Sequence, residues 1–286
     1  MKNHQKIKMR PLNDRFRARL IHLTPILASL LFGVLCAILI QTSTIELYAI
    51  LPFPDNSFGS FGNASYFVIL AAVGASLLYL LLKRKNRALI TLITGFALTT
   101  AVFMLSIVYL SAAFSSFTIP YMEASIIILS AVITALTDFA VFRIRNGVYT
   151  LTVLFLGGAL GTFLGVSIPT FSTILILGFL AIYDVFAVYR GPVGKIAHSG
   201  FEQLRGLGFS FKDIQMGLGD LTFYSMLSGH MLLNFGFIPC LVSIAGISFG
   251  CLLALKMLER KRMFPGLPFP IFFGLAAGLL TSLTKF

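Results

Sequence analysis

The sequence predicts an all-α, polytopic membrane protein with nine transmembrane helices, and three observations lead to this fold class. Hydrophobic residues make up 57% of the 286 residues and charged residues only 11%, whereas about 25% of the residues in a soluble domain are charged. The apolar residues form long blocks, and a block of about 20 such residues crosses the hydrocarbon core of a bilayer. The basic residues gather in alternate connections between these blocks. Water-soluble fold classes are therefore excluded.

Nine blocks are long enough to be transmembrane helices, and they set the expected order of elements. They cover residues 20–41, 64–82, 88–112, 122–142, 148–166, 170–189, 215–236, 238–257 and 265–284. Only Ser167-Ile168-Pro169 separates the fifth from the sixth, where the proline breaks the helix. The division of 215–257 into two helices rests on its length and on Pro239.

The basic residues predict how these helices are oriented. All but one of the 22 Lys and Arg, Lys285, fall at the N-terminus or in every second connection. Because cytoplasmic connections are enriched in Lys and Arg, we expect a cytoplasmic N-terminus and a C-terminus outside. The net charge of +12 thus reflects membrane topology, and no nucleic-acid partner is expected. The first block is too long for the core of a cleaved signal peptide, so an uncleaved first helix is expected.

Small residues repeat every four positions in three of the blocks. They are Gly157, Gly161 and Gly165, then Gly246 and Gly250, then Gly274 and Gly278. This spacing lets the backbones of neighbouring helices approach closely in lipid, so these glycines are expected to form packing faces.

Four acidic residues lie inside the predicted spans, where an ionisable side chain is a functional candidate. Glu123 lies at the outer end of its helix, and Asp138 lies close enough to Arg143 to pair with the basic cluster there, so structural roles are expected for both. Asp184 and Asp220 lie on consecutive antiparallel helices, each about 9–12 Å from the cytoplasmic boundary. The matching depth predicts that these two carboxyls face each other.

Two facing carboxyls can perform a hydrolysis that needs neither a metal nor a covalent intermediate. At short range they cannot both be ionised cheaply, so they share a proton. One then acts as a general base toward water and the other as an acid toward a carbonyl oxygen, which is sufficient to hydrolyse a peptide bond. From spacing alone, two unrelated aspartates at helix ends remain an equal alternative.

The residues around these aspartates resemble a known family. Asp184 follows Tyr183 in the sixth span, Asp220 ends Gly217-Leu218-Gly219-Asp220 in the seventh, and Pro265-Gly266-Leu267-Pro268 opens the ninth. Their order and their helix numbers resemble the presenilin and signal peptide peptidase family of intramembrane aspartyl proteases, and the resemblance covers nearly the whole chain. It implies that Asp184 and Asp220 are the catalytic pair, with Tyr183 before the first.

The resemblance also implies roles for the two glycine- and proline-containing motifs. Gly217, Leu218 and Gly219 match the motif that admits the substrate backbone to the second aspartate. Pro265, Gly266, Leu267 and Pro268 match a Pro-Ala-Leu motif in which Gly266 replaces the alanine. Prolines there leave backbone groups unpaired at membrane depth, and we expect this segment to offer them to an unwound substrate as an added strand.

This interpretation divides one integral membrane domain into parts. Residues 1–19 form a basic cytoplasmic segment, residues 20–169 carry five scaffold helices, and residues 170–286 carry the catalytic helices with a cytoplasmic loop at 190–214. That loop is short, and the compact chain resembles archaeal presenilin homologues that work without accessory subunits. The expected substrates are transmembrane peptides or membrane proteins in the bilayer, which is the plasma membrane in a prokaryote. No cofactor or metal is expected.

Other functions are weighed against this one. A proton-coupled transporter or channel would use Asp138, Asp184 and Asp220 as a relay, and a non-catalytic scaffold would tolerate their replacement. A Gly-x-Ser-x-Gly string around Ser248 lies in a helix interior rather than at the strand-to-helix turn that such a nucleophile needs. His230 is expected to be a hydrogen-bonded packing residue. The three cysteines, Cys36, Cys240 and Cys251, are expected to be small buried hydrophobic residues.

Overall fold

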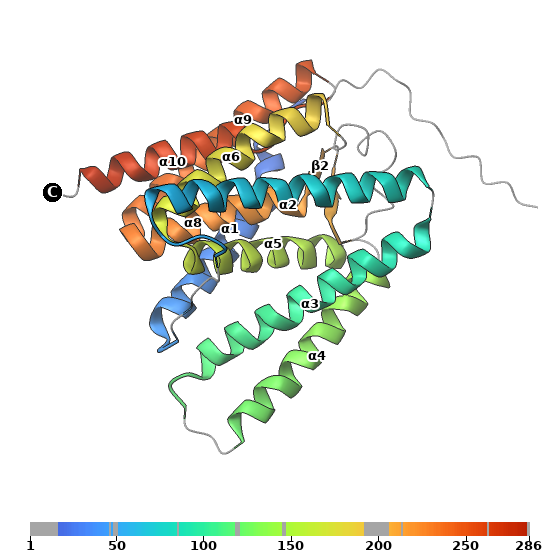
Figure 1. Ribbon diagram of the computed structural model, residues 1–286, viewed down its shortest axis with the longest axis vertical. Helices are drawn as coiled ribbons and strands as arrows, with labels where there is room; N and C mark the ends of the chain where they lie inside the picture. The colour runs from blue at the N-terminus through green and yellow to red at the C-terminus, as the bar shows by residue number, and fades with distance from the viewer. Residues whose placement is uncertain are drawn as a thin grey trace, which may run out of the picture.

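The computed structural model describes residues 17–45, 47, 51–84, 86–117, 121–144, 147–191, 206–212, 214–261 and 263–284. Within these ranges it has nine α-helices, one short 3₁₀ turn η1 (Leu20–Leu23) and one antiparallel two-stranded sheet (Figure 1). The helices are α1 (Thr24–Thr42), α2 (Ser57–Lys83), α3 (Arg87–Phe114), α4 (Met122–Phe142), α5 (Gly147–Ser167), α6 (Thr170–Tyr189), α8 (Leu218–Phe235), α9 (Phe237–Arg260) and α10 (Pro268–Leu283). The strands are β1 (Gly208–Phe211) and β2 (Ile214–Gly217).

Each predicted span overlaps one of these helices, which confirms the all-α membrane fold class. Seven of the described helices are long and apolar enough to cross a membrane, namely α1 with η1, then α2 to α6 and α9. The other two are α8 and the 16-residue α10. The orientation of the two termini across the membrane stays a prediction.

Helix α8 lies at the centre of the molecule, which explains why it is less apolar than its neighbours. It packs against α5, α1, α9 and α10, and nearly all of its residues from Leu221 to Leu232 are buried. Its small polar residues Ser225 and Ser228 are fully buried against protein. A helix surrounded by protein does not need the apolar surface that a lipid-facing helix requires.

The predicted packing faces of glycines are confirmed. A Cβ on Gly161 or Gly165 of α5 would collide with the backbone carbonyl of Thr222 or Met226 on α8. On α9, a Cβ on Gly246 or Gly250 would lie 2.5 Å from a backbone carbonyl of α10. The absence of side chains at these positions therefore sets how closely α5 approaches α8, and α9 approaches α10.

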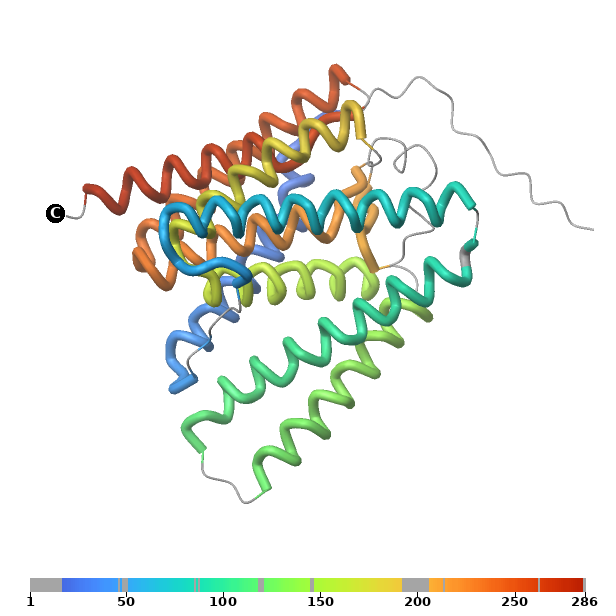
Figure 2. The backbone as a smooth tube through the Cα atoms, viewed as in Figure 1, coloured from blue at the N-terminus to red at the C-terminus, as the bar shows by residue number. Residues whose placement is uncertain are grey.

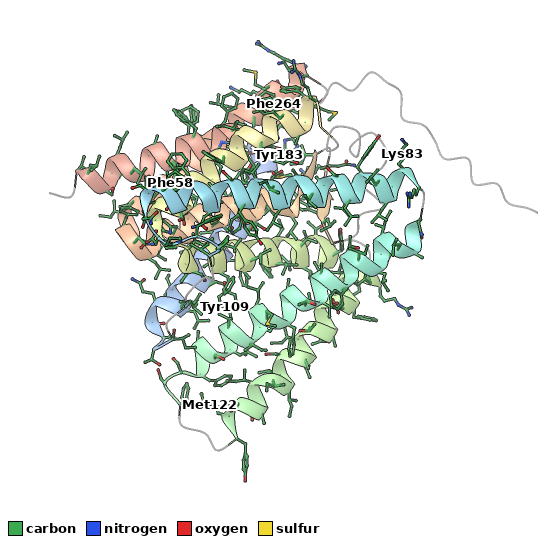
Figure 3. All side chains as sticks on the ribbon, in the orientation of Figure 1. Phe58, Lys83, Tyr109, Met122, Tyr183 and Phe264 are labelled. Atoms are coloured by element: carbon green, nitrogen blue, oxygen red, sulfur yellow. The ribbon has the colours of Figure 1, made fainter. Side chains whose placement is uncertain are left out.

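The remaining helices lie around this centre. Helix α2 packs on α6, and α3 pairs with α4; the α3–α4 pair diverges from α6, α9 and α10 in Figure 2. Large apolar side chains such as Ile69, Phe96 and Leu136 are exposed on these helices, as expected for surfaces that face lipid. Phe58 and Lys83, at the two ends of α2, lie at opposite ends of that helix in Figure 3.

Three helix boundaries differ from the predicted ones, each for a local reason. Helix α2 begins at Ser57 rather than 64, because the Asn56 side chain accepts a hydrogen bond from the Gly59 N–H at 2.6 Å and caps the helix. Helix α10 begins at Pro268 rather than 265, since a proline is well suited to the first turn. The predicted division between α8 and α9 is confirmed; it falls at Gly236, whose φ of +95° suits glycine.

The third difference is the hairpin that precedes α8. Residues 215–217 were expected to open the seventh span, but they belong to β2, which pairs with β1 in the register Gly208 to Gly217 and Phe211 to Ile214. The Tyr149 hydroxyl, at the start of α5, donates to the Gly208 carbonyl at 2.5 Å and accepts from the Gly206 N–H at 3.1 Å. The hairpin occupies the end of the predicted loop 190–214; residues 192–205 and 213 lie outside the described residues.

Candidate active site

The two predicted aspartates come from the adjacent ends of α6 and α8. Asp184 lies five residues before the end of α6, and Asp220 lies in the first turn of α8. Their carboxyl groups are close enough to interact electrostatically, and each is partly buried. The structure therefore brings together two acids that are 36 residues apart in the sequence, as the matching depth predicted.

The segment before α10 lies against both carboxyl groups. The Leu267 N–H donates to Asp184 Oδ2 at 3.0 Å, and the Gly266 N–H also donates to Asp184. A Cβ on Gly266 would lie only 3.0 Å from Asp220 Oδ2, which is closer than ordinary van der Waals contact. The Asp220 carboxyl can approach this position closely because residue 266 is a glycine rather than an alanine.

This segment differs from the added strand that the sequence suggested. Pro265 to Leu267 form no strand, and Pro265 and Leu267 are buried. The Leu267 N–H is bonded to Asp184, and the Gly266 carbonyl accepts from the Tyr224 hydroxyl at 2.9 Å. These backbone groups are already paired inside the protein, so the extended backbone near the aspartates is instead the hairpin β1–β2.

Two glycines that precede Asp220 have room for a Cβ at ordinary van der Waals distance from their neighbours. A Cβ on Gly217 would lie 3.9 Å from the nearest atom, and a Cβ on Gly219 would lie 3.8 Å from the Phe223 ring. Neither glycine has a positive φ. Internal packing therefore does not require glycine at either position, in contrast to the glycines of α5.

A cavity of about 100 Å³ opens beside Asp220. Its polar lining comes from Asp220, Tyr224, Cys251 and Gln215, and its apolar lining includes Ile26 of α1 and Leu255 of α9. A cavity of this volume with several polar groups has room for water. Water can therefore reach a carboxyl that lies among buried helices.

The backbone edge of β2 borders the same cavity. Gln215 and Met216 of this strand line it. In an antiparallel hairpin with this register, the Gln215 N–H and C=O point away from β1. On the other strand, the outward Gly208 carbonyl is already bonded to Tyr149. The edge of β2 therefore faces the cavity, and the Gln215 N–H and C=O there are available to bind another backbone.

The other sequence candidates lie in separate surroundings. Tyr183 precedes Asp184 on α6 and is partly buried; it and Phe264, just before the Pro265 segment, lie in the same upper part of Figure 3. Asp138 on α4 accepts a hydrogen bond from the Thr99 hydroxyl on α3 at 2.7 Å, so its partner is Thr99 rather than the expected Arg143. Glu123 is exposed in the first turn of α4.

The structure also settles the minor sequence candidates. His230 is buried with Nδ1 2.7 Å from the Gly165 carbonyl and Nε2 3.1 Å from the Thr170 hydroxyl, which confirms a hydrogen-bonded packing role. The Ser248 hydroxyl donates to the Ile244 carbonyl of its own helix at 2.8 Å, and no strand-to-helix turn surrounds it. The three cysteines are free and buried, as expected.

Sequence reasoning missed two components of the site, the hairpin and Tyr224. Tyr224 lies four residues after Asp220 on α8, and side chains at this spacing share one face of a helix. That spacing was the available signal. For the hairpin, the signal was the alternation of apolar and polar residues in Phe209-Ser210-Phe211 and Ile214-Gln215-Met216.

Comparisons with known proteins agree with this architecture. No family model matches the sequence, and no curated protein sequence matches it. Two solved structures of a presenilin family intramembrane aspartate protease are similar to the chain. The one in space group C222 has a TM-score of 0.64 and 18% identity, and the match covers 93% of this chain and 99% of that chain. The one in space group P2 has a TM-score of 0.63 and 20% identity, with 91% and 95% covered. The chain therefore has the fold of a presenilin family intramembrane aspartate protease.

Proposed function

We propose that this protein is an intramembrane aspartyl protease that hydrolyses peptide bonds within the transmembrane segments of membrane-protein substrates. The observation that carries the proposal is the pair of interacting carboxyls, Asp184 and Asp220, the second of which lines a cavity with room for water. The fold shared with presenilin family proteases supports it. The catalytic unit is α6 to α10, and α1 to α5 serve as the scaffold.

The chemistry requires one ionised and one protonated carboxyl. Two N–H groups, those of Gly266 and Leu267, point at Asp184, whereas Asp220 has one backbone donor, Gly217, and such donors favour the ionised form of a carboxyl. This assigns Asp184 as the general base and Asp220 as the acid. Asp184 takes a proton from water as the water oxygen attacks the scissile carbonyl carbon, and Asp220 gives its proton to the carbonyl oxygen.

The second half of the reaction returns both carboxyls to their starting states. The tetrahedral intermediate carries two hydroxyls, and Asp220 takes back a proton from one of them as the C=O bond re-forms. The C–N bond breaks, and the departing nitrogen receives the proton that Asp184 had taken. The products are a new carboxyl and a new amine, and one water is consumed.

The substrate backbone approaches the dyad over Gly217 and Gly219. A helical substrate holds its carbonyls in hydrogen bonds to N–H groups four residues ahead, so it must unwind locally before water can attack. In lipid, each unpaired backbone group costs several kcal/mol. The Gln215 N–H and C=O at the edge of β2 are placed to replace part of these lost hydrogen bonds.

Cleavage of a transmembrane reporter peptide by the purified protein in liposomes tests this function. We expect two fragments whose new ends lie within the apolar segment, identified by mass spectrometry. A proton-coupled transporter or channel would instead give pH-dependent flux and an intact reporter. No cofactor or accessory subunit is added, since none is implied by the site.

A further inference from the structure

One peptide unit connects the two helices that carry the aspartates. This unit joins Gly266 to Leu267. Its carbonyl oxygen accepts a hydrogen bond from the Tyr224 hydroxyl of α8 at 2.9 Å, and its N–H donates to Asp184 Oδ2 of α6 at 3.0 Å. Because the carbonyl and the N–H of a peptide unit lie in one plane, fixing one of them fixes the direction of the other.

The Tyr224 side chain is held firmly enough to fix this plane. It is only 2% exposed, in the centre of the molecule, and its hydroxyl also contacts the thiol of Cys251 on α9. A buried tyrosine hydroxyl needs a hydrogen-bond partner, and the Gly266 carbonyl provides it. The titratable side chains that face the peptide unit are Asp184 from α6, Asp220 and Tyr224 from α8, and Cys251 from α9.

We propose that Tyr224 is a positioning residue for the dyad, acting through the Gly266–Leu267 peptide unit, an inference that rests on the proposed function. Its hydroxyl holds the carbonyl of this unit so that the Leu267 N–H points at Asp184. The N–H then keeps the Asp184 carboxylate oriented toward the water and favours its ionised form. Tyr224 neither gives nor takes a proton in the reaction; it acts on the dyad through the peptide unit.

The change Tyr224→Phe tests the inference, because it removes the hydroxyl and keeps the ring that fills the core. The matched control is Tyr109→Phe. The Tyr109 hydroxyl also donates a partly buried hydrogen bond between helices, from α3 to the Ala159 carbonyl of α5 at 2.7 Å. Both changes remove a hydroxyl that donates to a backbone carbonyl, but only the Gly266 carbonyl belongs to the peptide unit beside Asp184.

Two readouts separate positioning from general stability. The first is hydrogen exchange, because only Gly266 and Leu267 carry an N–H between Pro265 and Pro268. Loss of one buried hydrogen bond should speed exchange of these two amides about tenfold in Tyr224→Phe, with no change in Tyr109→Phe. The second is the kinetics of reporter cleavage. In Tyr224→Phe we expect kcat to fall about tenfold with KM unchanged, and the acidic limb of the pH–rate profile to move to higher pH.

Each outcome bears on a distinct statement. Unchanged exchange at Gly266 and Leu267 in Tyr224→Phe overturns the positioning role whether or not the wild type cleaves the reporter. Faster exchange with an unchanged kcat and pH profile in an active enzyme overturns it as well. A wild-type protein that leaves the reporter intact contradicts the proposed function, and the exchange comparison then decides alone whether Tyr224 orients the peptide unit.

Discussion

At the scale of single residues, the glycines fall into two kinds that the sequence does not distinguish. Gly161 lacks a side chain because the backbone of α8 fills the space where its Cβ would lie. Gly219 has no such neighbour, and it is exposed beside Asp220. The first kind serves packing, and the second leaves room for a molecule from outside the fold.

Replacing one glycine of each kind by alanine should separate folding from catalysis. Gly161→Ala forces a methyl group into the α8 backbone and should lower the free energy of unfolding by about 1–3 kcal/mol. Gly219→Ala should leave thermal unfolding unchanged and reduce reporter cleavage by up to about a hundredfold, because a displaced substrate is misaligned with the dyad. Equal activity of Gly219→Ala and wild type would argue against substrate approach over this residue.

The rate of cleavage should depend on pH in a bell-shaped manner. At low pH the rate falls because the base, Asp184, becomes protonated, and at high pH it falls because the acid, Asp220, loses its proton. The two limbs belong to the pair rather than to either residue. Measuring kcat across pH with a substrate whose binding is shown to be constant checks this. A flat profile from mildly acidic to neutral pH would count against a shared proton.

The sequence predicted the two aspartates of the site but not Tyr224. The depths of Asp184 and Asp220 were predictable, because helix geometry converts positions in the sequence into distances along the membrane normal. Tyr224 was not singled out, since an i+4 tyrosine on a buried helix is usually a packing residue. Its hydrogen bond to Gly266 depends on how α10 begins, and no local pattern encodes that.

At the scale of elements, the hairpin was the main feature that the sequence did not predict. Its apolar and polar residues alternate, but the turn contains Lys212 with a φ of +52° instead of the Asn-Gly or Asp-Gly that usually marks such a turn. The last residues of β2 also run directly into an apolar helix. The apolar residues of β2 and α8 therefore form one continuous block in the sequence. For this reason the helix was predicted to begin at residue 215, three residues before the observed start of α8.

The hairpin and the start of α10 lead to a prediction about the substrate. A central Gly pair near the scissile bond should raise turnover, because it lowers the cost of unwinding the substrate helix. Pro268→Ala should lower turnover for either substrate and leave folding intact, because Pro268 fixes where α10 begins. The measurement is kcat for matched reporter peptides, with and without the Gly pair, with wild type and Pro268→Ala. Identical rates for both peptides with both enzymes would show that local unwinding does not limit the reaction.

At the scale of the whole molecule, the number and order of the helices were predictable, but their arrangement was not. The alternation of basic connections supported nine helices, because a missed helix would have disturbed it. Nothing in the apolar pattern indicated that α8 occupies the centre. Helix α8 contains the buried polar residues Ser225, Ser228 and His230. In the sequence such residues could equally line a water-filled path, and only the packing of α5 along α8 shows that they lie inside the protein.

In the proposed function, α6 and α8 alone carry the reacting groups, and the helices around them hold these two helices in place. Asp138 on α4 offers a natural comparison, because it is another intramembrane acid with its own hydrogen bond to Thr99. If the protein were a proton relay, all three aspartates would contribute. If it is a protease with the proposed dyad, only Asp184 and Asp220 take part in the reaction.

The most direct test of the central claim is cleavage of a transmembrane reporter in liposomes by three single variants. We expect Asp184→Asn and Asp220→Asn each to abolish cleavage, because an amide can neither accept the proton from water nor donate one to the carbonyl oxygen. Asp138→Asn should retain most of the wild-type turnover. Equal folding of all variants is checked by thermal unfolding. The account would be contradicted if Asp220→Asn kept more than a small fraction of the wild-type activity. It would also be contradicted if folded Asp138→Asn lost all cleavage activity.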